Sequence, residues 1–178
     1  MKAKFVVLTI LILISFSENL FACSCIGHRS VKKEIKHSDA VLVGIIISKE
    51  LVIYRDSNYL KKWSYDTLLL SSPMARVKVA KYELLVEGFY KGKITNDTVI
   101  VYTGIGGGDC GYRFEIGEKY IIYGEKETYI GQDDNMFGFP KGKNIYWTYI
   151  CLRTTKYFED EINEIEKILK KEQVLFPK

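Results

Sequence analysis

The chain has 178 residues, of which 47% are hydrophobic and 27% charged, and its formal net charge is +4. This length fits one domain with its own hydrophobic core. Its Lys and Arg residues are interleaved with Asp and Glu, whereas a nucleic-acid-binding protein usually concentrates its basic residues, so we do not expect nucleic acid as a partner.

The first 22 residues have the three parts of a secretory signal peptide. They comprise a basic start, an apolar stretch over 5–16, and the small residue Ala22 before the expected cleavage point. The apolar stretch is shorter than the roughly 20 residues that a membrane-spanning helix needs. The sequence therefore predicts a signal peptide over 1–22 and an exported single domain over 23–178, either secreted or in the periplasm or cell envelope.

Cleavage after Ala22 gives the mature chain an unusual first residue, Cys23, with a free α-amine. An α-amine titrates near pH 8, so part of it is neutral and able to bind a metal ion. The run Leu20-Phe21-Ala22-Cys23 also looks like a lipobox, in which the cysteine is acylated and attaches the protein to a membrane. Lipidation of Cys23 would leave an odd number of cysteines for pairing, which favours the soluble product; we expect membrane attachment only if Cys23 is lipidated.

One helix is predicted near each end of the mature chain. Ser30 is a suitable N-cap for a short helix over 30–37. The tail over 157–171 places Phe158, Ile162 and Ile165 on one helical face.

Between the helices, the sequence alternates strand patterns with turns. Runs rich in β-branched and aromatic residues predict strands, and these cover 40–47, 76–90, 98–103, 119–123 and 145–152. The intervening segments 50–76 and 126–144 are expected to be loops. About five strands with flanking helices predict a mainly β fold, a small closed or partly closed antiparallel OB-like barrel.

All four cysteines, Cys23, Cys25, Cys110 and Cys151, follow the predicted signal peptide. An even number in an exported chain predicts two disulfides. Cys23 and Cys25 lie about 7 Å apart in an extended chain and are too distant to pair with each other. Two schemes remain open, and each joins the N-terminus to Cys110 and Cys151. A four-cysteine zinc site is the less favoured alternative, because such sites usually contain two C-x₂-C pairs.

The remaining motifs do not indicate an enzyme or a resident cofactor. The glycine-rich run over 106–111 matches G-x-G-x-x-G, but it leads towards another strand and does not open a helix, which a dinucleotide site requires. His28 and His37 are in no metal-ligand pattern, and Asp133-Asp134 lacks the spacing of a calcium loop. We therefore predict neither catalysis nor a cofactor.

The arrangement of the cysteines resembles that of the tissue inhibitors of metalloproteinases. The residues that carry the resemblance are Cys23-Ser24-Cys25 at the mature start, Cys110-Gly111-Tyr112 after the glycine-rich loop, and the lone Cys151. Three further stretches strengthen it: Ser38-Asp39-Ala40-Val41, Tyr82-Glu83-Leu84-Leu85 through Tyr90-Lys91-Gly92, and Val101-Tyr102-Thr103. The resemblance covers residues 23–155 and implies a netrin-like OB-fold domain in a compact, bacterial-type form.

This resemblance implies a pairing and a mechanism. Cys23 would pair with Cys110, and Cys25 with Cys151. The α-amine and carbonyl of Cys23 would chelate the catalytic zinc of a metalloproteinase, and the side chain of Ser24 would enter the specificity pocket of the protease.

Other positions of the family also have counterparts here. Gly108 and Asp109 would pack beside the N-terminal segment. Gly27 stands where the animal inhibitors usually have proline. Netrin-like domains also serve as binding modules, so the alternative function is a secreted or envelope-attached module that binds a partner without inhibiting a protease.

Overall fold

The computed structural model describes residues 25, 27, 29–55, 76–106, 108–130 and 137–175, with side chains up to 171. The predicted signal peptide, Cys23, Ser24, His28 and most of the predicted 50–76 loop lie outside the described residues.

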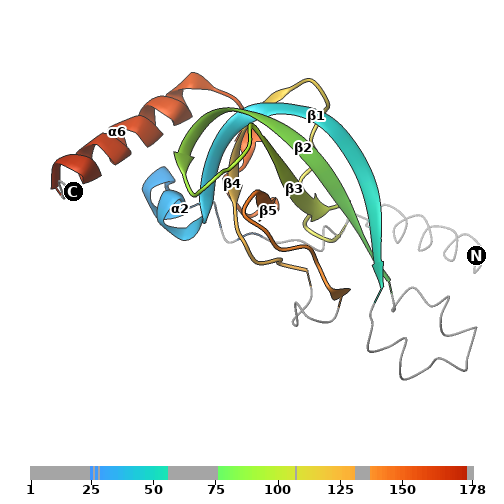
Figure 1. Cartoon of the computed structure of the whole chain (residues 1–178). Coiled ribbons are helices and arrows are strands. Elements are labelled where there is room, and N and C mark those ends of the chain that lie inside the picture. The colour runs from blue at the N-terminus through green and yellow to red at the C-terminus, as the bar shows by residue number, and fades with distance from the viewer. Residues whose placement is uncertain are drawn as a thin grey trace, which may run out of the picture.

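The described chain is mainly β, as predicted, with a helix near each end of the domain (Figure 1). The helices are α2 (Val31–His37) and α6 (Glu159–Leu175). Six strands form one sheet in the order β5-β3-β2-β1-β4-β6. The strands are β1 (Ala40–Arg55), β2 (Arg76–Lys91), β3 (Thr98–Gly104), β4 (Lys119–Gly124), β5 (Ile145–Trp147) and β6 (Thr155–Lys156).

The sequence predicts a closed or partly closed antiparallel barrel; the six-stranded sheet is not closed, and one of its pairings is parallel. β5 pairs with β3 in parallel, and the ladder ends at β5 on one side and at β6 on the other. One isolated bridge joins Glu125, just after β4, to Trp147 in β5, with N–H···O distances of 2.8 and 2.7 Å. β5 has only three residues, so it cannot supply a second full ladder, and closure is limited to this bridge.

Lys126 links the start of the connection between β4 and β5 to its end. Its Nζ donates to the carbonyls of Gly142, Lys143 and Ile145 at 2.7, 2.7 and 3.0 Å, and lies 3.7 Å from the centre of the Tyr146 ring. These contacts hold both ends of the connection together. After this connection the chain runs alongside β3, and β5 pairs with β3 in parallel.

β1 and β2 form a long curved hairpin that extends past the rest of the sheet (Figure 1). The prediction of a loop from residue 50 is wrong, because β1 continues to Arg55 and pairs there with Arg76. β4 pairs with β1 only between Ala40 and Ile45. The distal half of β1 is stabilised by pairing with β2 and by Val52 and Tyr54, which pack against the body of the domain.

Three clusters of buried side chains make up the core. The first lies between the curved strands and includes Leu42, Tyr82 and Tyr120. The second joins the sheet to both helices through residues such as Ile35, Tyr123 and Ile165. The third covers the other face of β2, β3 and β5 and includes Val79, Tyr102, Phe139 and Trp147.

Candidate functional site

The candidate site is the rim where the N-terminal segment meets the sheet. We call it the cysteine edge and define it as Cys25, the loop over 104–112 and the turn over 149–151. Cys25 is disulfide-bonded to Cys151 with a Cα–Cα distance of 5.2 Å, which is the pairing that the resemblance implies for Cys25. Cys110 is also disulfide-bonded, and its partner lies outside the described residues. This bonding indicates an oxidising, extracellular-type compartment.

The backbone connects the two cysteine-bearing segments of the sheet directly. The carbonyl of Cys110 accepts a hydrogen bond from the N–H of Ile150 at 3.0 Å. Cys110 has φ 58°, and in the described part of the chain it is the only non-glycine residue with a positive φ. This left-handed conformation is unfavourable for a residue with a Cβ and is retained where surrounding bonds fix it. Cys110 and Cys151 are therefore held side by side.

Asp109 supports this loop from inside. Its carboxylate accepts hydrogen bonds from the N–H groups of Ile105 at 2.6 Å, Gly106 at 2.8 Å and Gly111 at 3.0 Å. Aspartate often closes turns by binding backbone N–H groups in this way. The resemblance implies that Asp109 packs beside the N-terminal segment, which stays a prediction; the structure shows that its carboxylate binds the backbone of its own loop. The resemblance implies the same packing for Gly108. This residue has φ 122°, a conformation that favours glycine.

The glycine-rich sequence has a steric reason at Gly111. A Cβ at this position would lie 2.2 Å from the carbonyl carbon of Gly104, so any larger residue would force the loop away from the end of β3. The loop leads into an irregular segment with no helix. Gly111 thus permits close backbone packing, and the loop does not open the helix that a dinucleotide fingerprint requires.

Two tyrosines that the sequence analysis missed complete the cysteine edge. The hydroxyl of Tyr129 accepts the N–H of Gly104 at 2.6 Å, and its ring lies 4.5 Å from that of Tyr149. Burial raises the pKa of Tyr129 above its ordinary value. Nothing in the sequence pattern marks Tyr129, because it lies in a segment without strand or helix periodicity. Its neighbour in space, Tyr149, could have been noted for being two residues from Cys151.

The segment after Cys25 takes a path that needs glycine. Gly27 has φ 60°, and its N–H donates to the carbonyl of Cys25 at 2.9 Å. Proline has neither this φ nor an N–H. Proline at position 27 could not form this turn.

A buried ion pair holds the same segment further along. Arg153 Nε donates to Glu161 Oε1 at 2.8 Å, and Arg153 Nη1 donates to the carbonyl of Arg29 at 3.2 Å. The hydroxyl of Tyr123 also donates to Glu161 Oε1, at 2.7 Å. Burial and this contact with Glu161 raise the pKa of Tyr123, so its hydroxyl stays protonated. The N-terminal segment is thus fixed to the domain at Cys25 and again at Arg29.

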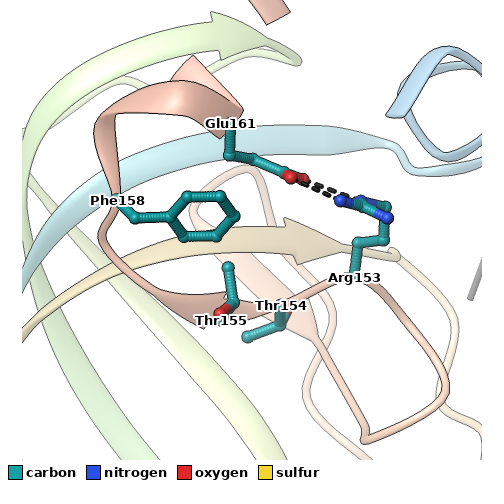
Figure 2. Close-up of a pocket in the computed structure, with 5 residues that line it drawn as sticks. All are labelled: Arg153, Thr154, Thr155, Phe158 and Glu161. Atoms are coloured by element: carbon teal, nitrogen blue, oxygen red, sulfur yellow. Dashed lines mark hydrogen bonds and ion pairs between the residues drawn. The ribbon is translucent and has the colours of Figure 1, made fainter. Parts of the chain in front are cut away.

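Figure 2 shows the small pocket beside this ion pair. Its volume is about 180 Å³, and Arg153 and Glu161 line it together with Thr154, Thr155 and Phe158. The hydroxyl of Thr154 accepts a hydrogen bond from the N–H of Tyr123, and Arg153 and Glu161 are paired with each other. The two charged groups and the Thr154 hydroxyl are therefore engaged within the protein, and we assign the pocket a structural role.

The described residues contain no group of three His, Cys, Asp or Glu side chains placed to hold a metal ion. His37 Nε2 lies 2.9 Å from Glu125 Oε1, within hydrogen-bond distance. In the same described ranges, no helix is both long and apolar enough to cross a membrane.

The role of Asp109 can be tested by stability. We expect Asp109→Ala to lower the free energy of unfolding by about 2 kcal/mol, because three N–H groups lose their acceptor. Asp109→Asn keeps one acceptor oxygen and should lose less. Urea unfolding measures both variants. The matched control is Asp97→Ala, at an exposed aspartate, which should change stability by less than about 0.5 kcal/mol. Equal effects at the two positions would contradict the supporting role of Asp109.

Compared with known proteins, the chain matches no family model and no curated protein.

Proposed function

We propose that this protein is an exported inhibitor of zinc metalloproteinases that acts through the α-amine and carbonyl of Cys23. The observation that carries the proposal is the double attachment of the N-terminal segment, by the disulfide of Cys25 to Cys151 and by the hydrogen bond from Arg153 to Arg29. A segment fixed in this way loses little conformational entropy on binding, which favours affinity. The surroundings of the predicted chelating residue are thus suited to rigid presentation.

The chemistry follows from the properties of catalytic zinc. Such a zinc ion has three protein ligands and an open position that holds water. A neutral amine and the adjacent carbonyl oxygen of Cys23 form an N,O-chelate that displaces this water. The side chain of Ser24 then points into the specificity pocket, where a small polar group is accommodated. The zinc belongs to the protease, and the inhibitor contributes no metal of its own.

The proposed fold is a partly closed OB-like barrel. The parallel pairing of β5 with β3, the antiparallel pairing of β4 with β1, and the bridge from Glu125 to Trp147 support it. In such a barrel the rim that carries Cys25, Cys110 and Cys151 is one continuous edge. A rigid edge of this kind suits insertion into the cleft of a protease.

An added N-terminal residue tests the mechanism. One alanine before Cys23 moves the α-amine away from the carbonyl of Cys23 and should abolish inhibition of zinc endopeptidases, while the urea-unfolding midpoint stays the same. One alanine after Lys178 is the control and should leave inhibition intact. Intact-mass analysis with N-terminal peptide mapping first establishes that Cys23 is the unmodified first residue.

Two outcomes would contradict the proposal. Equal inhibition by the chain with alanine before Cys23 would rule out chelation. If the chain that begins at Cys23 inhibits no zinc endopeptidase, or if Cys23 is acylated, the alternative of a secreted or envelope-attached binding module takes its place.

A further inference from the structure

One side of β1 has no partner strand beyond Ile46 in the described part of the chain. β2 pairs with β1 along its whole length, but β4 pairs with the other side only as far as Ile45, and the turn before β4 is bonded to Ile46. No described strand lies on that side of residues 47–55, which we call the free edge. Such an edge leaves a row of backbone N–H and C=O groups open to another strand.

The free edge lacks the usual protection against pairing with another chain. Natural edge strands are commonly short, or they carry prolines or several lysines. The free edge contains no proline and one lysine, and two of its aliphatic side chains are exposed, Leu51 by 62% and Ile53 by 50%. Val52 and Tyr54 pack against the body of the domain, so the extended form of the edge is already fixed.

The charges of the free edge select one register for antiparallel pairing with a second copy of this chain. A two-fold axis at Lys49 or at Glu50 places this residue opposite its own copy, and an axis at Val52 places Lys49 opposite Arg55. Like charges on directly opposed strand residues destabilise a sheet. An axis at Leu51 pairs the whole of the free edge and leaves every charged side chain opposite an uncharged one. Axes nearer either end of the free edge pair a much shorter stretch.

We propose that the free edge pairs with the free edge of a second copy in this register, which gives a two-fold dimer with one continuous sheet. Leu51 of each copy then faces Leu51 of the other, with Ile53 diagonal to it, so the exposed aliphatic side chains are buried together. Both free edges are used in the contact, so assembly stops at two copies. A strand of another protein could bond the same backbone groups, but the match of this edge to itself favours a second copy. This inference does not depend on protease inhibition.

Cysteine cross-linking tests the register directly. Opposed residues of an antiparallel pair have Cα atoms about 4.5–5.5 Å apart, a separation that a disulfide spans. Leu51→Cys should therefore give a covalent dimer when the chain from Cys23 to Lys178 is mildly oxidised. Ile53→Cys is the matched control, because the two copies of this residue would lie roughly 13 Å apart along the paired strands and should not cross-link. The described cysteines are all disulfide-bonded, so the introduced thiol is the reactive one among the described residues.

Sedimentation equilibrium tests the same dimer without an added cysteine. A single strand edge makes a small interface, so we expect a dissociation constant on the order of 100 μM. Leu51→Lys places a positive charge on both sides of the axis and should weaken dimerisation at least about tenfold. Ile105→Lys is the control: Ile105 is an exposed aliphatic residue just after β3, which β2 separates from β1, so this variant should dimerise like the unmodified chain.

Four results would overturn the proposal. A chain that stays monomeric at about 1 mM would leave a strand of another protein as the occupant of the free edge. A dimer that Leu51→Lys leaves intact, or that Ile105→Lys weakens equally, would place the contact elsewhere on the molecule. Cross-linking of Ile53→Cys as readily as Leu51→Cys would contradict the register. Urea unfolding of both lysine variants checks that they remain folded, since each change is at an exposed residue.

Discussion

Replacing Glu161 by alanine should lower the free energy of unfolding by about 3 kcal/mol, measured by urea denaturation. The Glu161 side chain is 2% exposed and accepts hydrogen bonds from Arg153 and from the hydroxyl of Tyr123. Its removal leaves a buried hydroxyl and a guanidinium without their acceptor. The Arg153 side chain is 26% exposed and can regain some hydration, so the expected loss lies at the low end for a broken buried pair.

Two further variants separate the parts of this network. Tyr123→Phe removes one hydrogen bond and should cost about 1 kcal/mol. The exposed pair between Lys156 and Glu115 is the matched control, and Lys156→Ala should cost less than about 1 kcal/mol. If Glu161→Ala were no more destabilising than Lys156→Ala, the ion pair would have no structural role.

Strand positions were largely predictable because most described strands are runs rich in β-branched and aromatic residues. The strands that begin at Thr98 and Lys119 match their predictions within one residue. The prediction of a final strand over 145–152 is wrong beyond Trp147, where the strand ends and the chain turns to bring Cys151 to Cys25. The two-residue strand β6 is too short to give a pattern and was not predicted.

The distal half of β1 shows how a strand can be mistaken for a loop. Val52 and Tyr54 alternate with exposed residues, which is a strand signal, but exposed aliphatic residues at Leu51 and Ile53 obscure it. The pairing partner, Arg76 to Lys81, is separated from this segment by about 20 residues, so the cross-strand contacts cannot be read locally.

In helix α6, the buried apolar face was predictable from the sequence, but the buried ion pair was not. Ile162 and Ile165 are buried as predicted, but Phe158 is 43% exposed. An acid in the first turn of a helix is ordinarily solvated and favoured by the helix dipole, so Glu161 gave no sign of burial. Its partner Arg153 lies before the helix, and only the fold brings the two together. The cysteine pairing came from the family resemblance, since spacing alone left two schemes open.

Removing the disulfide of Cys25 and Cys151 tests both the stability and the function of the cysteine edge. The bond joins residues 126 positions apart, so it restricts the unfolded chain strongly. We expect Cys25→Ser with Cys151→Ser to lower the free energy of unfolding by about 2–5 kcal/mol in urea. Ser30→Ala is the control: Ser30 caps α2 without a side-chain hydrogen bond, so the change should be within about 0.5 kcal/mol.

The functional result distinguishes attachment from stability. Much of the core lies between the strands and does not include Cys25 or Cys151, so we expect the double variant to stay folded, which circular dichroism checks. Its N-terminal segment retains the hydrogen bond to Arg29 but has lost the covalent link at Cys25. If rigid presentation of Cys23 supports inhibition, inhibition should weaken in this folded variant because the segment must be ordered on binding. Full inhibition by the folded double variant would show that the attachment at Cys25 contributes to stability alone.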